Sequence, residues 1–322
     1  MIPISNPRAS YIEHKEEIDK AVLKVLSSGS YILREEVNKF EDRFAKYIGV
    51  KHCIGVASGT DALFLSMKAL GIGKGDEVIT VSHTAVATVS AIVSAGANPV
   101  LIDIKDNFTM NPEKIHKAIT KRTKAIIPVH LYGKPCDMNA IMAYNIPVIE
   151  DCAQAAGAIY HGKHVGSIGK IGCFSFYPTK NLGCFGDGGA ITTNDKKLDK
   201  NLRLLREYGW KKRYISSIHG YNSRLDEIQA AVLNVKLKYI DQDNERRREV
   251  AKIYGNGNYD ENSVYHLYVV RRKNRGKEGP VHYPVPIHLQ PAYKDVIVSG
   301  CMRETEKASK EVLSLPMYPQ LC

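Results

Sequence analysis

Lys180 lies in a short turn whose residue types suggest carbonyl chemistry. The turn reads Tyr177-Pro178-Thr179-Lys180-Asn181-Leu182-Gly183 and follows an expected strand, Cys173 to Phe176. If the fold buries this lysine, its pKa falls and its neutral amine becomes a nucleophile. A lone lysine in a loop is more often simply solvated, so the chemical interpretation depends on what lies around it.

A carboxylate ends a second apolar strand. The run Ile149-Glu150-Asp151-Cys152-Ala153-Gln154 closes the expected strand Val148 to Asp151 and places an amide, Gln154, three positions after Asp151. A carboxylate at a buried strand end needs a cationic partner. The alternative role for Asp151 is to cap a helix.

Small residues form a third candidate group, Ala57-Ser58-Gly59-Thr60-Asp61-Ala62. An amphipathic stretch follows, with Leu63, Met67 and Leu70 on one stripe, so the group opens a helix. Bare backbone N–H groups at a helix start can hold a phosphate. The alternative is an ordinary helix cap.

The elements that must position these groups follow an α/β pattern. Over the first 200 residues, short β-rich runs alternate with amphipathic stretches, which favours a mostly parallel sheet covered by helices. Asp151 and Lys180 lie at or just after the ends of expected strands, and ligands of open α/β sheets bind beyond the carboxyl ends of the strands. The expected strands are Glu77 to Ser82, Pro99 to Ile104, Ala125 to His130, Val148 to Asp151, Cys173 to Phe176 and Gly189 to Thr193, with helices at Thr84 to Ala95 and Met138 to Tyr144.

The second part of the chain predicts a separate, smaller unit. One long helix is expected from Leu225 towards Tyr254, linking two domains, and Val264 to Arg271 is expected to form a strand. We therefore expect a large domain at residues 1–240, including the N-terminal segment, and a smaller C-terminal α+β domain at residues 241–322.

Together, the three groups suggest a pyridoxal phosphate site: an anion cradle, an acid for the pyridine nitrogen and a lysine for the aldehyde. Lys180 lies 29 residues after Asp151, and the glycine-rich turn Gly186-Asp187-Gly188-Gly189 follows it. With this order and spacing the chain resembles the DegT/DnrJ/EryC1/StrS family of sugar aminotransferases, from about Tyr31 to Pro319. The resemblance implies the fold type I architecture of pyridoxal phosphate enzymes, with a large domain built on a mostly parallel central sheet.

The resemblance also assigns roles to the candidate residues. Lys180 would bind the cofactor's aldehyde, Asp151 would hold the pyridine nitrogen protonated, and Gln154 would lie near the phenolic oxygen. The residues expected to bind the phosphate are Gly59, Thr60 and Ser175.

Asn222 is expected to reach a second subunit. The segment Gly220-Tyr221-Asn222-Ser223-Arg224-Leu225-Asp226 resembles the family's GxNxRL motif, whose asparagine contacts the phosphate in the neighbouring subunit. This implies a homodimer with shared active sites. The alternative is that Asn222 caps the long helix.

Two positions depart from the family pattern. Ala85 stands where many relatives carry an aromatic residue that stacks on the cofactor ring, and His83 is the candidate to cover the ring instead. The alternative for His83 is a polar residue at a strand end. Arg34 replaces a glycine found in many relatives, and it would either alter access or meet a phosphate.

The resemblance implies a nucleotide-linked keto-sugar and L-glutamate as substrates, giving an amino sugar for cell-surface glycans or secondary metabolites. Tyr177 replaces the histidine more usual in relatives that aminate the sugar's 4-position, which favours a 3-keto sugar. His282 and His288 lie in stretches that resemble the family's substrate region, although histidines near proline turns are more often structural. Two alternatives stay open, a keto-inositol aminotransferase and a non-catalytic regulator that binds the cofactor; Lys180 argues against the dehydratases of the family, which carry histidine there.

Composition restricts the remaining possibilities. The chain has 322 residues, 44% hydrophobic and 25% charged, typical of a globular protein, and no apolar run long enough to span a membrane. The net charge of +11 is spread along the chain, so we expect no nucleic-acid partner. Seven scattered cysteines indicate free thiols rather than a metal site, and with no signal peptide we expect a cytoplasmic protein.

Several connections look short beside the family. Only Met138 to Tyr144 can form a helix between the strands ending at His130 and starting at Val148, and residues 273–279 replace a longer helical insert. The chain also stops at Cys322, where relatives continue into a last helix. Either the protein is trimmed or segments are missing from this sequence.

Overall fold

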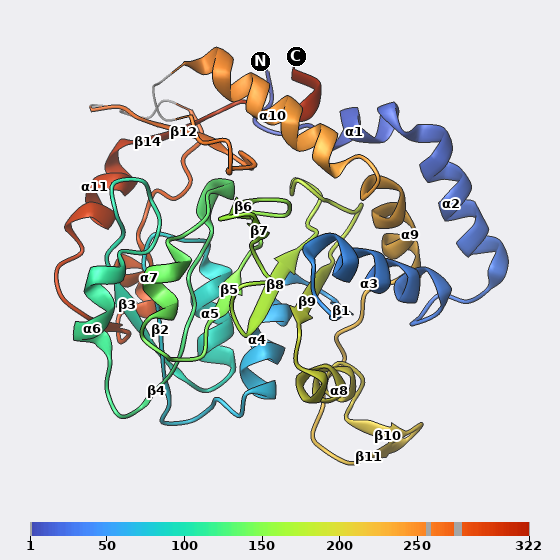
Figure 1. Cartoon of the computed structure of the whole chain (residues 1–322), viewed down its shortest axis with the longest axis horizontal. Coiled ribbons are helices and arrows are strands. Elements are labelled where there is room, and N and C mark those ends of the chain that lie inside the picture. The colour runs from blue at the N-terminus through green and yellow to red at the C-terminus, as the bar shows by residue number, and fades with distance from the viewer. Residues whose placement is uncertain (1, 256–258, 274–278, 322) are drawn as a thin grey trace.

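The central element of the fold is a mixed sheet with helices packed on both faces (Figure 1). The computed structural model describes residues 2–255, 259–273 and 279–321. Alternate residues of one central strand point to opposite faces, as the period of a strand requires: Cys173 packs in one hydrophobic cluster and Phe174 in another. The α/β fold expected from the sequence is confirmed.

The sheet consists of two four-stranded parts that lie side by side. The first part has the order β1-β9-β8-β5 and the second the order β13-β3-β2-β4. Parallel bridges from Ile126 to Val148 and from Val129 to Asp151 join β4 to β5. All pairs are parallel except those of β9, which runs antiparallel to both β1 and β8. The strands are β1 (His52–Val56), β2 (Glu77–Val81), β3 (Asn98–Ile102), β4 (Thr123–Ile126), β5 (Ile149–Asp151), β8 (Ile171–Ser175), β9 (Gly189–Thr193) and β13 (Ile297–Val298).

The helices divide between the two faces. The cluster on one face joins the sheet to α4 and α8, and the cluster on the other joins it to α3 and α9. The helices are α1 (Pro7–Glu13), α2 (Lys15–Ser28), α3 (Glu35–Ile48), α4 (Gly59–Ala69), α5 (Val86–Ser94), α6 (Ile115–Ala118), α7 (Met138–Met142), α8 (Lys196–Leu205), α9 (Glu227–Lys236), α10 (Ile240–Tyr254) and α11 (Arg303–Glu311). Two short hairpins lie outside the central sheet, β6 (Ile159–Tyr160) with β7 (Lys163–His164) and β10 (Trp210–Lys212) with β11 (Ile215–Ser216).

The prediction of one long helix from Leu225 was wrong. The structure has two helices, α9 and α10, separated by a turn at Leu237–Tyr239. α9 packs against α2 and α3, whereas α10 contacts the C-terminal part of the chain. These different partners fix different helix directions, and the turn carries no proline or glycine that would mark it in the sequence.

The C-terminal part contains a two-stranded antiparallel sheet, β12 (Tyr268–Arg271) with β14 (Val312–Leu315). β12 is shorter than the strand expected from Val264, because the preceding residues bond to a loop instead: the Val264 N–H donates to the Gly133 carbonyl at 3.0 Å. Residues 256–258 in the connection before β12, residues 274–278 in the connection after it, and residue 322 lie outside the described residues. Most of the short 273–279 connection is therefore not described. β13 belongs to this part of the chain by sequence, yet it pairs with β3 of the central sheet.

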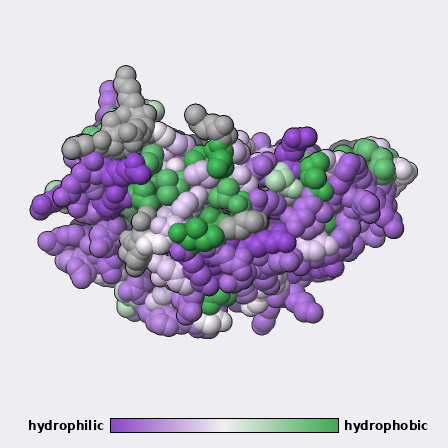
Figure 2. All heavy atoms as spheres, turned by 90° about the horizontal axis from the view of Figure 1, so that it is seen from above, coloured by the Kyte–Doolittle hydropathy of each residue, from purple (hydrophilic) through white to green (hydrophobic). Residues whose placement is uncertain are grey.

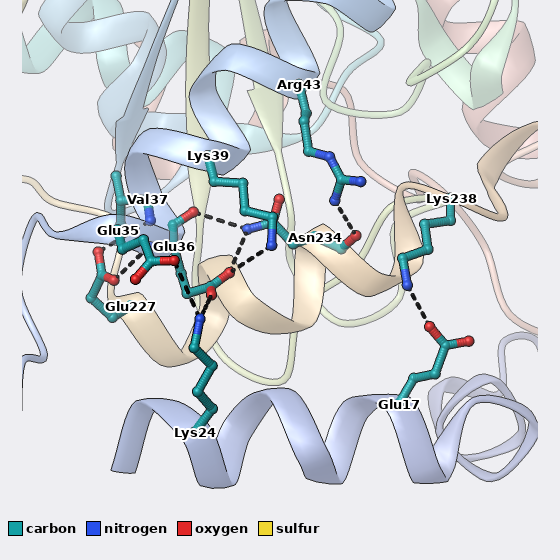
Figure 3. Close-up of polar contacts among 10 residues, drawn as sticks. All are labelled: Glu17, Lys24, Glu35, Glu36, Val37, Lys39, Arg43, Glu227, Asn234 and Lys238. Atoms are coloured by element: carbon teal, nitrogen blue, oxygen red, sulfur yellow. Dashed lines mark hydrogen bonds and ion pairs between the residues drawn. The ribbon is translucent and has the colours of Figure 1, made fainter. Parts of the chain in front are cut away.

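The N-terminal helices are fastened to α9 by polar side chains (Figure 3). The Glu227 carboxylate accepts hydrogen bonds from the backbone N–H groups of Arg34, Glu36 and Val37 at 2.6 to 3.1 Å, so it caps the start of α3. Lys24 on α2 lies 3.3 Å from the Glu36 carboxylate. Arg34 is thus held through its backbone.

Surface and cysteine chemistry are consistent with the composition. Among the described residues, no helix is long and apolar enough to cross a membrane. The face in Figure 2 is mainly hydrophilic, with apolar side chains gathered in small groups. Six of the seven cysteines lie in the described part of the chain; all six are free thiols, and only Cys301 is exposed.

Candidate active site

The phosphate cradle is built by the start of α4 and the end of β8. Ser58 caps α4, its hydroxyl accepting the Asp61 N–H at 3.1 Å. A Cβ atom on Gly59 would lie 2.6 Å from the Ser175 Cβ, so only glycine lets the two segments approach this closely. The N–H groups at the very start of a helix have no partner within it, so those of Gly59 and Thr60 can face an anion.

Asp151 is a buried carboxylate with two neutral donors. The Thr88 hydroxyl donates to Oδ2 at 2.8 Å and the Ala153 N–H donates to Oδ1 at 3.1 Å. Burial raises the pKa of Asp151, while these hydrogen bonds and the positive charge of Lys180 lower it. A cation placed at this carboxylate would further stabilise its charged form.

Lys180 is held in the tight turn by its own backbone. The Lys180 N–H donates to the Tyr177 carbonyl at 2.8 Å. Removal from water lowers the pKa of the Lys180 ammonium to about 8, against the opposing effect of the Asp151 charge. An amine with this pKa is partly neutral near physiological pH, which is what attack on an aldehyde requires.

These groups meet in one cavity of about 240 Å³. The cavity brings together seven residues predicted from the sequence: Gly59, Thr60, Asp151, Gln154, Ser175, Tyr177 and Lys180. A larger cavity of about 670 Å³ lies beside β12 and contains none of the predicted residues. The chemistry therefore belongs to the smaller cavity.

Gln154 is fixed on both sides. Its Oε1 accepts the Tyr132 N–H at 2.7 Å, and its Nε2 donates to the Tyr283 hydroxyl at 3.0 Å. Burial raises the pKa of Tyr283 to about 12, so this phenol stays protonated. The amide is thus held in one orientation in the cavity wall.

His83 is buried and packs against the rings of Phe108 and Tyr132. Its Nε2 is 2.8 Å from the Tyr132 hydroxyl, and burial lowers the pKa of His83 to about 4, so the ring is neutral. Ala85 lines the cavity, and His83 is not among its lining residues.

The two C-terminal histidines have partners within the chain. His282 Nδ1 is 2.8 Å from the Ser314 hydroxyl, and burial together with the positive charge of Lys180 lowers the pKa of His282. His288 Nδ1 is 2.7 Å from the Ser82 hydroxyl. Neither histidine lines the 240 Å³ cavity.

Asn222 is exposed and does not line the cavity of its own chain. It lies at an isolated bridge to Glu207, just before the start of α9. This position leaves its side chain available to another molecule.

Sequence reasoning missed three residues that shape the site. Thr88 supports Asp151, while Tyr132 and Tyr283 hold Gln154. For Thr88 the sequence contained a weak indication of a role in the site, because this residue lies in the first turn of the helix that follows β2. Tyr132 carried no such indication, and Tyr283 carried only its place beside His282 in the stretch that resembles the family's substrate region.

The residues present fit pyridoxal phosphate. The cavity offers a phosphate cradle in which a Cβ cannot be accommodated at Gly59, a buried carboxylate with only neutral donors, and an amine whose pKa is lowered to about 8. A pyridine nitrogen can take its proton beside Asp151, and the aldehyde can meet Lys180.

Comparison with known proteins agrees with this site. The model of the DegT/DnrJ/EryC1/StrS aminotransferase family matches residues 12–266 and 258–322. The chain belongs to this family. Membership identifies an aminotransferase that uses pyridoxal phosphate, so the expected reaction class and cofactor are confirmed.

Two curated relatives cover nearly the whole chain. The dTDP-3-amino-3,6-dideoxy-alpha-D-galactopyranose transaminase of Aneurinibacillus thermoaerophilus is 48% identical over 345 residues, covering 99% of this chain and 95% of that protein. The dTDP-3-amino-3,4,6-trideoxy-alpha-D-glucose transaminase of Streptomyces venezuelae is 43% identical, covering 99% and 92%.

A solved relative has the same fold. The crystal structure of DesV from S. venezuelae in complex with a ketimine intermediate is 42% identical to this aminotransferase. It superposes with a TM-score of 0.95, covering 100% of this chain and 94% of that one. The fold type I architecture expected from the sequence is therefore confirmed.

Proposed function

We propose that this aminotransferase moves the amino group of L-glutamate to the C3 ketone of a nucleotide-linked sugar, working as a homodimer. The observation that carries the proposal is the placement of Lys180 and Asp151 in one cavity with the cradle at Gly59. The relatives described above are named as transaminases of dTDP-linked 3-amino sugars, which supports a nucleotide-linked 3-keto substrate.

Lys180 and Asp151 take complementary roles. When bound, pyridoxal phosphate supplies a ring that accepts electrons from the donor's Cα. Asp151, stabilised by the Thr88 hydroxyl at 2.8 Å, keeps the pyridine nitrogen protonated and so keeps the ring electron-accepting. Lys180, with a pKa of about 8, takes the proton from Cα and returns it on the cofactor side.

The phosphate is held by both subunits in this proposal. Gly59, Thr60 and Ser175 of one chain line the cavity. Asn222, exposed in its own chain, reaches the phosphate of the partner. A homodimer in analytical ultracentrifugation is the expected result.

Tyr177 is the proposed contact near the reacting ketone. It lines the cavity and is 52% exposed, so it lies at the mouth, where a substrate enters. A phenol offers one hydroxyl donor and acceptor where an imidazole would offer a ring nitrogen. His282 and His288 would then act only indirectly, since each already has a partner in the chain.

The test is to supply matched 3-keto and 4-keto dTDP-sugars with L-glutamate and to locate the new amine by NMR. Amination at C3 is expected. Amination only at C4 would refute the assignment of the ketone position while leaving the lysine chemistry intact. Failure with both sugars, but turnover with a keto-inositol, would refute the nucleotide-sugar assignment.

A further inference from the structure

The segment from Tyr221 to Glu227 alternates between buried and exposed side chains. Ser223, Leu225 and Glu227 are buried, whereas Asn222 and Asp226 are exposed. Extended backbone places successive side chains on opposite sides. The inward-facing residues therefore decide where Asn222 is presented.

Ser223 fastens this segment to the phosphate cradle of its own chain. Its hydroxyl accepts the Ala57 N–H at 3.1 Å and donates to Asp61 Oδ2 at 2.7 Å. Ala57 and Asp61 flank the cradle residues Ser58 to Thr60. The Ser223 side chain is buried, and the group that accepts its hydroxyl proton is the Asp61 carboxylate. This hydrogen bond is therefore stronger than an ordinary one at the surface.

The other two inward-facing residues, Leu225 and Glu227, attach the C-terminal end of the segment to β1 and α3. Leu225 packs against β1, since a Cβ on Gly55 would lie 3.0 Å from the Leu225 Cβ. Glu227 caps α3, as Figure 3 shows. Among the hydrogen bonds of the described residues, Ser223 is the side-chain link between this segment and the first turn of α4.

We propose that Ser223, acting through Asp61, is a positioning residue that couples the phosphate cradle of its own subunit to Asn222 and thereby to the cofactor site of the partner. The inference rests on the proposed homodimer, in which Asn222 reaches the partner's phosphate. Loss of the Ser223 hydroxyl then weakens cofactor binding chiefly in the other subunit, because its own cradle keeps Gly59, Thr60 and Ser175.

Mixed dimers in which only one subunit keeps Lys180 test whether Ser223 acts on the partner's cofactor site or on that of its own subunit. Two differently tagged chains are co-expressed, and Lys180→Ala in one of them leaves a single site able to bind the cofactor covalently. In the trans arrangement, Ser223→Ala lies on the Lys180→Ala chain. In the cis arrangement, it lies on the chain with the intact lysine. The readouts are the absorbance of lysine-bound cofactor during titration with pyridoxal phosphate and the rate of cofactor release.

The expected result is a Kd for pyridoxal phosphate about tenfold higher in the trans arrangement and nearly unchanged in the cis arrangement. Asp61→Ala should reproduce the trans effect, and Asp61→Asn, which keeps an accepting oxygen, should largely restore binding. Ser66→Ala is the matched control, because Ser66 is equally buried on α4 but donates to the Ala62 carbonyl.

An equal loss in both arrangements, or a larger loss in cis, would overturn the proposal, because Ser223 would then support the cradle of its own subunit at least as much as the site of the partner. Asn222→Ala separates this failure from failure of the shared site. If Asn222→Ala has no trans effect, or if the protein is a monomer, the shared phosphate site is wrong and the coupling fails with it.

Discussion

Asp151→Asn should change two properties of this enzyme in opposite directions. The Asp151 charge raises the pKa of Lys180, while burial lowers it, and the net pKa is about 8. At pH 7 about a tenth of the Lys180 amine is therefore neutral. Removing the carboxylate charge removes the opposing effect, so the Lys180 pKa should fall by about one unit.

Capture of pyridoxal phosphate by the apoprotein should then become faster at pH 7. With a pKa near 7, about half of the amine is neutral, and capture should accelerate about fivefold. Turnover should fall by at least ~100-fold, because an asparagine cannot hold the pyridine nitrogen protonated. Stopped-flow absorbance across a pH series measures capture, and a coupled assay of 2-oxoglutarate release from L-glutamate measures turnover.

The pH dependence of cofactor capture tests the direction of the Lys180 pKa shift. Wild-type capture should rise with pH through a midpoint near 8, and the midpoint for Asp151→Asn should lie lower. Asp187→Asn is the matched control, since Asp187 lines the same cavity but is exposed and screened by water. A midpoint for Asp151→Asn at or above the wild-type value, or near wild-type turnover, would refute the reasoning.

Three further substitutions test the roles of Lys180, Gly59 and Glu150. Lys180→Ala should fold normally but bind no cofactor covalently; borohydride reduction and peptide mapping of the wild type should place the adduct on Lys180, and an adduct elsewhere would overturn the assignment. Gly59→Ala should raise the Kd for pyridoxal phosphate at least about tenfold in spectroscopic titration, because its Cβ would meet the Ser175 Cβ at 2.6 Å; unchanged affinity would show that the cradle lies elsewhere. Glu150→Ala should lower the free energy of unfolding by about 3 kcal/mol in urea titration, because the carboxylate accepts three backbone N–H groups of residues 166–169 at 2.6 to 2.9 Å, and Glu150→Gln should lose less; equal losses would contradict this account.

The chemistry of the site was readable from the sequence because each part is locally encoded. Ser58 and Gly59 open a helix whose apolar stripe follows at once, and Lys180 lies in a turn bounded by a strand and by Gly183. A Cβ on Gly183 would lie 2.9 Å from the Tyr177 carbonyl, so the turn itself demands that glycine. Strand period, helix capping and turn chemistry act over a few residues, and they brought these groups to the same edge of the sheet.

The supports of these groups were decided only by the tertiary structure. Thr88 meets Asp151 across 63 positions of sequence, and Tyr283 meets Gln154 across 129. The break between α9 and α10 is equally non-local, since each helix follows a different packing partner. No local pattern encodes such contacts, because they arise when separate elements pack together. That packing buries Asp151, removes much of Lys180 from water and so shifts the pKa values of both groups.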